Sequence, residues 1–227
     1  MTITIRAANR DDTAGVREVI RAAFAGEGEI IERLVAALNQ AGHVQASLVA
    51  IDPGDDGDGA KDCDPDRRAH AANAADDTTS SEANVLGRVI GHVQLNRSWV
   101  DARERLVEVC VLSPLSVHPD YQGRGVGRAL VARALDEAGR RGSPAVFLEG
   151  DPAFYRQAGF GPASAHGFIR PSTRIPDPAC QVALLPGHQP WMTGQLVYCD
   201  PFWALDTVGL REPELSRVET SLASGQG

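Results

Sequence analysis

Three glycines lie within five residues in the run Gln122-Gly123-Arg124-Gly125-Val126-Gly127. Glycine at this density indicates that the backbone turns tightly or approaches another group closely. The residues that follow are apolar at helical spacing, which predicts a helix that begins near Gly125. The first amides of such a helix have no intrahelical acceptor and carry the positive end of its dipole. The run therefore predicts a site for an anion such as a diphosphate.

Two common glycine patterns are excluded by the neighbouring residues. The Walker pattern needs Gly-Lys followed by Ser or Thr, whereas Gly127 is followed by Arg128 and Ala129. The dinucleotide pattern needs a third glycine where Leu130 stands. A tight strand-to-helix turn that binds nothing remains the structural alternative.

The remaining pattern, Gln122-x-x-Gly125-x-Gly127 after a strand that ends in Val117-His118-Pro119, resembles the acyl-CoA signature of the GNAT superfamily of N-acetyltransferases. A second stretch, from Phe147 to Phe160, has the strand, the short helix and the Tyr155-x-x-x-Gly-Phe ending that follow the fifth strand in that superfamily. Its Gly-Asp-Pro-Ala-Phe-Tyr form looks like the YhbS-like branch. Order and spacing of the two stretches agree with the resemblance.

The resemblance implies a mixed α/β fold. We expect a twisted mixed sheet of six to seven strands, about four helices and a central strand pair that parts. It also implies an acyl-CoA-dependent enzyme that moves an acetyl group from acetyl-CoA, its cosubstrate, to a primary amine by direct attack. We expect one domain over residues 1–210, with an acidic insertion at 53–84 and a polar tail at 211–227.

The cofactor-binding residues that the resemblance implies lie in three segments. Pro114 cannot donate to a strand ladder, so it predicts a bulge at which Leu115 and Val117 offer free backbone groups. Two positions depart from the superfamily pattern, because Gln122 replaces arginine and Asp151-Pro152 stands where an asparagine is common. The full set is Leu115, Ser116, Val117, Gln122, Gly123, Arg124, Gly125, Val126, Gly127, Arg128, Asp151 and Tyr155.

Tyr155 is the candidate general acid. A phenol of pKa ~10 can protonate a thiolate whose thiol has a pKa of about 8 to 9 when the two are hydrogen-bonded. A packing role on a short helix is the alternative for this side chain. Glu108 and Glu149 are the candidate bases, since strand alternation places each among apolar neighbours that raise a carboxyl pKa. His92 and His118 stay open as further candidates, and a solvated or ion-paired role stays open for all four.

The other elements follow from periodicity and from turn residues. Asn9 and the acids after it are expected to start the first helix, and Gly42 to follow the second. Val85–Leu95 and Leu106–Leu112 are expected to form a hairpin whose loop surrounds Trp99 to Glu104. The remaining expected strands are Thr2–Arg6, Gln45–Ile51, Pro144–Leu148 and three closing strands within 165–169, 180–185 and 195–198, the last two joined as a hairpin by residues 186–191.

Composition excludes several classes of function. The formal charge is −8, but the stretch from Asp52 to Glu82 holds ten acidic and three basic residues and so carries nearly all of it. No basic patch is visible, which argues against nucleic-acid binding. No apolar run is long enough to span a membrane and the chain does not start like a signal peptide, so we expect a cytoplasmic protein. The cysteines lack metal-ligand spacing and are expected to be reduced core thiols: Cys63, Cys110, Cys180 and Cys199.

Several alternatives stay open at this stage. A small-molecule amine is the first choice of acceptor, and a protein lysine or N-terminal amine is the second. The acidic insertion is either an inert spacer or a contact for a basic partner. A non-catalytic acyl-CoA sensor or scaffold is the rival from another class, and a homodimer is left open.

Overall fold

A computed structural model describes residues 3–54, 87–210 and 213–224. We expected an acidic insertion at 53–84, and all of it except residues 53 and 54 lies outside the described residues. Cys63 therefore lies outside them too. The strands are β1 (Thr4–Ala7), β2 (Val44–Asp52), β3 (Arg88–Ala102), β4 (Leu106–Val117), β5 (Ala145–Glu149), β6 (Gly161–Pro162), β7 (Phe168–Ile169), β8 (Cys180–Leu184) and β9 (Gly194–Tyr198). The helices are α1 (Thr13–Ala23), α2 (Gly28–Gln40), α3 (Val126–Arg140), α4 (Pro152–Tyr155), α5 (Asp200–Ala204) and α6 (Glu214–Ser224).

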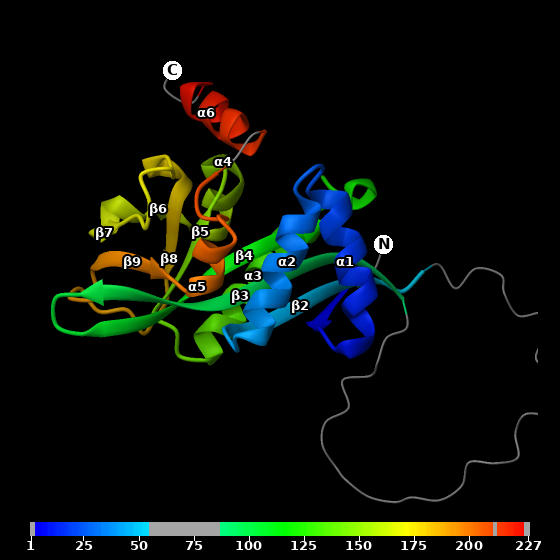
Figure 1. The fold of residues 1–227 in the computed structure, drawn as a ribbon, viewed down its shortest axis with the longest axis horizontal. Coiled ribbons are helices and arrows are strands. Elements are labelled where there is room, and N and C mark those ends of the chain that lie inside the picture. The colour runs from blue at the N-terminus through cyan, green and yellow to red at the C-terminus, as the bar shows by residue number, and fades with distance from the viewer. Residues whose placement is uncertain (1–2, 55–86, 211–212, 225–227) are drawn as a thin grey trace, which may run out of the picture.

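The described strands form one mixed sheet, with the order β1-β2-β3-β4-β5-β8-β6 (Figure 1). Along this order only β4 and β5 pair in parallel. The seven strands of four or more residues match the expected number, and the two-residue strands β6 and β7 add to it. The expected mixed α/β architecture is confirmed.

The end of β3 corrects two of our expectations. β3 continues to Ala102, so only residues 103–105 join it to β4, because its second half pairs on both sides, with β4 and with β9. β9 continues the sheet along β3 beyond the end of β2, while β8 pairs with β5. The expectation that β8 and β9 form a closing hairpin is therefore wrong, because β8 pairs with β5 and β9 pairs with β3.

Helices cover both faces of the sheet. Figure 1 shows α1 and α2 side by side over β2 and β3. On the other face α3 packs on apolar residues of β3, β4 and β5, including Val93, Leu95, Leu112, Val146 and Leu148, a set that we call the α3-side core. Burial of each such side chain contributes about 1.5–3 kcal/mol, so the sheet and α3 are held together strongly.

Two further apolar clusters lie on the face that α1 and α2 cover. The α1 cluster consists of Val16, Val19, Ile20, Val49, Ile51 and Val89. The α2-side core includes Leu34, Leu38, Val100, Val109, Phe147, Val182 and Phe202. Val218 of α6 also belongs to this core and is fully buried, so part of the expected polar tail at 211–227 is a helix with a buried side chain.

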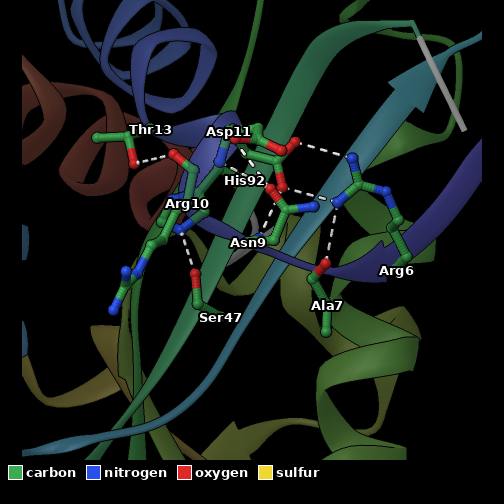
Figure 2. Close-up of polar contacts among 9 residues, drawn as sticks. Arg6, Ala7, Asn9, Arg10, Asp11, Thr13, Ser47 and His92 are labelled. Atoms are coloured by element: carbon green, nitrogen blue, oxygen red, sulfur yellow. Dashed lines mark hydrogen bonds and ion pairs between the residues drawn. The ribbon is translucent and has the colours of Figure 1, made fainter. Parts of the chain in front are cut away.

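The start of α1 is fixed by an ion pair at the N-terminus of the described chain (Figure 2). The Arg6 guanidinium donates two hydrogen bonds to the Asp12 carboxylate, at 2.7 and 2.8 Å. Asp12 also accepts a hydrogen bond from the Asn9 amide, and the Asn9 side chain in return accepts hydrogen bonds from the amides of Asp11 and Asp12. This capping box closes the 3-10 turn Arg10–Asp12, which leads directly into α1. Burial alone would raise the pKa of Asp12, but the hydrogen bonds from Arg6 and Asn9 and the Arg6 charge hold that pKa below its ordinary value.

Candidate active site

The glycine loop leads into α3 as the sequence indicated. Gly125 has a φ of 86°, which suits glycine, and it precedes the first helical residue, Val126. The first α-helical hydrogen bond runs from the Ala129 amide to the Gly125 carbonyl, 3.0 Å. The amides of residues 126–128 thus precede any intrahelical acceptor, and residues 122–125 before them are exposed.

The loop is tied to the end of β4 by a side chain. The Gln122 side-chain amide donates to the Val117 carbonyl at 3.0 Å. This bond links the glycine loop to the end of the strand. The Arg124 guanidinium lies over the Tyr121 ring, 5.5 Å from its centroid, and the Tyr121 hydroxyl donates to Asp52 at 2.8 Å.

The edge of β4 that faces β5 is open near its end. The His118 amide donates to the Ile90 carbonyl on β3 at 2.9 Å, so alternation turns the Val117 and Leu115 amides away from β3 and toward β5. β5 pairs with β4 only through Cys110–Val146 and Val111–Phe147. The expected parting of the central strands is therefore present.

The expected bulge lies at the same place. Leu95 pairs with Leu112 and Val93 pairs with Leu115, so two residues of β4 oppose the single residue Gln94. The two residues opposite Gln94 are Ser113 and Pro114, in agreement with the effect predicted for proline in a central strand.

The short helix α4 brings Tyr155 to the same region. Asp151 caps this helix by accepting the Ala153 amide at 2.8 Å. The half-buried Tyr155 ring lies edge-on to Phe154 and Phe160, with centroids 4.8 and 5.8 Å away. A Cβ at Gly150 would lie 2.6 Å from this ring, so the ring rests directly on the backbone that follows β5.

Gly127 is the point at which the three segments meet. A Cβ placed there would lie 3.3 Å from Cζ of Phe154, 3.6 Å from a Val117 methyl group and 3.9 Å from a Leu115 methyl group. The N-terminus of α3, the open edge of β4 and the helix that carries Tyr155 are thus in one place, although they are far apart in the sequence.

The sequence model of the Acetyltransferase (GNAT) family matches residues 46–160, which include all three of these segments. The chain belongs to the GNAT acetyltransferase family. This family membership confirms the resemblance and identifies the chain as an acetyltransferase.

Individual GNAT proteins agree with this assignment. The uncharacterized N-acetyltransferase YjhQ of Escherichia coli is 31% identical over 123 residues, which cover 52% of this chain and 67% of that protein. The uncharacterized N-acetyltransferase MJ1207 of Methanocaldococcus jannaschii is 34% identical over 82 residues, which cover 34% of this chain and only 36% of that protein.

Solved GNAT structures share the fold over most of the chain. YhbS of Escherichia coli, in complex with CoA, has a TM-score of 0.65 and 26% identity, and the match covers 88% of this chain and 91% of that one. A GNAT acetyltransferase of Brucella melitensis, in complex with acetyl-CoA, has a TM-score of 0.60 at 23% identity, covering 88% and 98% of the two chains, and supports the fold alone.

Glu108 does not have the surroundings that we expected for this GNAT chain. More than half of its side chain is exposed, its neighbour Leu106 is exposed too, and Arg97 pairs with it at 3.2 Å. The strand face that Glu108 occupies is thus not covered at this end of β4, and the expectation of apolar surroundings is wrong. Seven residues of extended strand, about 20 Å, separate Glu108 from Leu115.

Glu149 lies at the end of β5, next to the parting, on the face of the fully buried Phe147. Its carboxylate accepts the Gly209 amide at 2.9 Å. Burial, followed by the negative charge of Glu149, raises the pKa of the Tyr198 hydroxyl well above its ordinary value. Glu149 thus lies two residues beyond the last β4–β5 pair, on the face of the α2-side core, whereas Glu108 lies toward the other end of β4.

The two histidines differ in environment. His118 accepts the Asp120 amide through Nδ1, 3.3 Å, and its Nε2 lies 3.1 Å from Arg88. His92 is fully buried, with Nε2 3.0 Å from the Ser47 hydroxyl (Figure 2), and burial lowers its pKa to about 4.

A row of polar side chains on β3 was missed at the sequence level. His92, Gln94, Asn96 and Ser98 are all at most 1% exposed, and Ser116 of β4, at 1%, pairs with His92. The alternation of polar and apolar residues in this strand was the available signal, because a strand buried on both faces is normally apolar throughout.

Other chemistry finds no support among the described residues. No group of His, Cys, Asp or Glu in this part of the chain has the arrangement of a metal site. Cys110, Cys180 and Cys199 are buried and unpaired, and burial raises the pKa of Cys180 to about 12 and of Cys199 to about 11. No described helix is long and apolar enough to cross a bilayer.

Proposed function

We propose that this chain binds acetyl-CoA across the N-terminus of α3 and the parted edge of β4, and passes the acetyl group to a primary amine that attacks directly. One observation carries the proposal. Helix amides without an intrahelical acceptor and open strand amides meet at Gly127. The first kind of group binds a diphosphate, and the second binds an arm that contains amides.

The diphosphate is assigned to the glycine loop. The amides of residues 126–128 and of the loop before them present fixed dipoles to an anion, and this arrangement needs no lysine. Arg124 and Arg128 are exposed beside these amides and add positive charge. Ser116, in contrast, turns its backbone amide toward β3 and a buried side chain to the other face, so we assign it no contact with the cofactor.

The open edge of β4 is assigned to the arm and to the reacting carbonyl. The Leu115 and Val117 amides point toward β5, where no ladder uses them. An amide held rigidly at this place stabilises negative charge on the thioester oxygen as the amine attacks. Acetyl-CoA supplies the activated acyl group, and the chain supplies orientation and charge stabilisation.

We assign Tyr155 the role of general acid, which donates a proton to the departing thiolate. Its ring is fixed by Phe154, Phe160 and the Gly150 backbone, so its hydroxyl has a defined direction. Such pre-organisation is what a general acid requires. Asp151, which caps α4, is assigned a positioning role for this helix.

Glu149 is our candidate to take the proton from the amine, directly or through water. It lies on β5 beside the parting, whereas Glu108 is far along β4 and paired with Arg97. The acceptor that we propose is a small molecule, and residues 1–210 are proposed to form the catalytic domain.

The experiment is a thiol-release assay with acetyl-CoA and a panel of amines, amino acids, polyamines, aminoglycosides and a lysine peptide. Acceptor-dependent release of thiol, with mass spectrometry of the acetylated amine, supports the proposal. Acetyl-CoA hydrolysis without acetylated amine, or no release with any acceptor, contradicts it.

A further inference from the structure

The buried polar row of β3 and Ser116 of β4, which we call the polar stripe, lies on the face of α1 and α2. Val93 and Leu95 belong to the α3-side core, so the alternate residues from His92 to Ser98 point to the opposite face. Ser116 shares this face because it is the cross-strand partner of His92. The stripe separates the α1 cluster from the α2-side core.

Four atoms of the stripe have no hydrogen-bond partner among the described residues. They are Nδ1 of His92, Oε1 of Gln94, Oγ of Ser98 and Oγ of Ser116. The bonds that the stripe does make join its own members, reach the bulge or, for Nε2 of His92, reach the Ser47 hydroxyl on β2. Gln94 donates to Asn96 at 2.7 Å, and Asn96 donates to the Ser113 carbonyl at 2.6 Å. Buried polar atoms without partners are rare in folded proteins and destabilise them, so a row of four is a place where a polar ligand or ordered water can bind.

The stripe lies directly beside the proposed reaction centre. Ser116 stands between Leu115 and Val117, whose amides face the parting, and Asn96 binds the carbonyl of the bulge itself. Ser98 follows Asn96 on the same face, about 7 Å further along the strand. A molecule that reaches the bulge from the side of α1 and α2 therefore lies along the stripe.

We propose that the polar stripe is the acceptor subsite, and that the acceptor is a small primary amine that carries hydroxyl groups. This inference rests on the proposed function. The unpartnered atoms include oxygen acceptors and hydroxyl groups but no charged side chain, a set that matches alcohol groups. A lysine side chain would bring four methylene groups against these polar atoms and leave them unpaired. Since the stripe is at most 1% exposed, binding requires a local outward shift of the helices above it.

The first test compares two amines with the same six-carbon chain, glucamine, which carries five hydroxyl groups, and n-hexylamine, which carries none, together with a lysine peptide. We expect a kcat/KM at least tenfold higher for glucamine than for hexylamine or the peptide, since a site built to bind hydroxyl groups discriminates strongly against analogues that lack them. Equal or better use of hexylamine or of the peptide overturns the inference.

The second test uses Ser98→Ala, with Ser143→Ala as the matched control. The Ser143 hydroxyl donates to the Ala145 carbonyl at 2.9 Å, so its loss should lower Tm and leave acceptor kinetics unchanged. Loss of the unpartnered Ser98 hydroxyl should instead raise Tm by about 2–4 °C and raise the glucamine KM several-fold, with the acetyl-CoA Kd unchanged. A lower Tm with an unchanged KM shows a purely structural hydroxyl and overturns the inference.

Calorimetry with acetyl-CoA distinguishes a failure of the proposed function from a failure of the proposed acceptor subsite. No binding of acetyl-CoA to the wild-type chain means that the proposed function itself fails. Binding and acetyl transfer without the hydroxyl preference mean that only the acceptor subsite is wrong.

Discussion

Tyr155 is the residue on which the proposed chemistry depends most. Its ring is fixed on three sides, and replacement by phenylalanine removes only the hydroxyl. We expect Tyr155→Phe to lower kcat about 10²- to 10⁴-fold, because a general acid contributes on this scale. The Kd for acetyl-CoA, measured by calorimetry, should change little.

Tyr121→Phe is the matched control for this variant. It also removes a tyrosine hydroxyl, one that donates to Asp52, and retains the aromatic ring beneath Arg124. Its kcat should stay near the wild-type value. Equal losses in the two variants would show that a hydroxyl near the site affects structure rather than proton transfer.

The two carboxylates that the sequence suggested as bases give a second prediction. Glu149→Gln should lower kcat about 100-fold and weaken the dependence of the rate on pH at its acidic limb, because a base has to be ionised to act. Glu108→Gln, far from the bulge and exposed, should behave like wild type. pH–rate profiles of both variants test this, and the opposite ranking would exclude Glu149 as the base.

At the scale of elements, the start of α1 should be sensitive to one ion pair. Asp12→Asn removes a charge that holds Arg6 and the Asn9 turn, and we expect a loss of about 2–3 kcal/mol in the free energy of unfolding at pH 7. The folded-state pKa of Asp12 is lowered, so this stabilisation is present above the unfolded pKa of about 3.9 and disappears as the pH falls through the folded value.

Urea unfolding of wild type and Asp12→Asn at pH 7 and pH 3 measures this effect. The difference between the two proteins should shrink at pH 3. A difference that does not depend on pH would mean that the carboxylate charge contributes nothing and that packing explains the loss.

The elements that carry the site could be predicted because their signals are local. The helical spacing after Gly125, the proline in β4 and the Tyr155 segment each specify their own structure within about a dozen residues. The α3 start, the bulge and the parted strands all follow from such signals.

Features that depend on distant partners could not be predicted in this way. β9 pairs with the second half of β3, almost a hundred residues earlier, so neither the length of β3 nor the absence of the closing hairpin was visible. Glu108 lies on the same strand face as Cys110, as the alternation predicted. Nothing in the sequence of β4 shows that this face stays exposed to solvent at Glu108. Val218 is buried only because the α2-side core extends to it.

At the scale of the whole molecule, the sheet holds together a site whose parts are separated in sequence. β4 supplies open amides, α3 supplies a helix N-terminus and α4 supplies Tyr155, and each depends on the sheet for its place. The close approach at Gly127 makes this convergence testable with one substitution on α3.

The most direct measurement is a calorimetric titration of acetyl-CoA into wild type, Gly127→Leu and Gly139→Leu. A side chain at 127 meets Phe154, Val117 and Leu115, whereas the same change at Gly139, later on α3, has nothing within 4 Å. We expect wild-type affinity for Gly139→Leu and a Kd at least tenfold weaker for Gly127→Leu, with both variants folded by circular dichroism. Unchanged affinity in Gly127→Leu, or no binding by the wild-type chain, would contradict the proposed acetyl-CoA site.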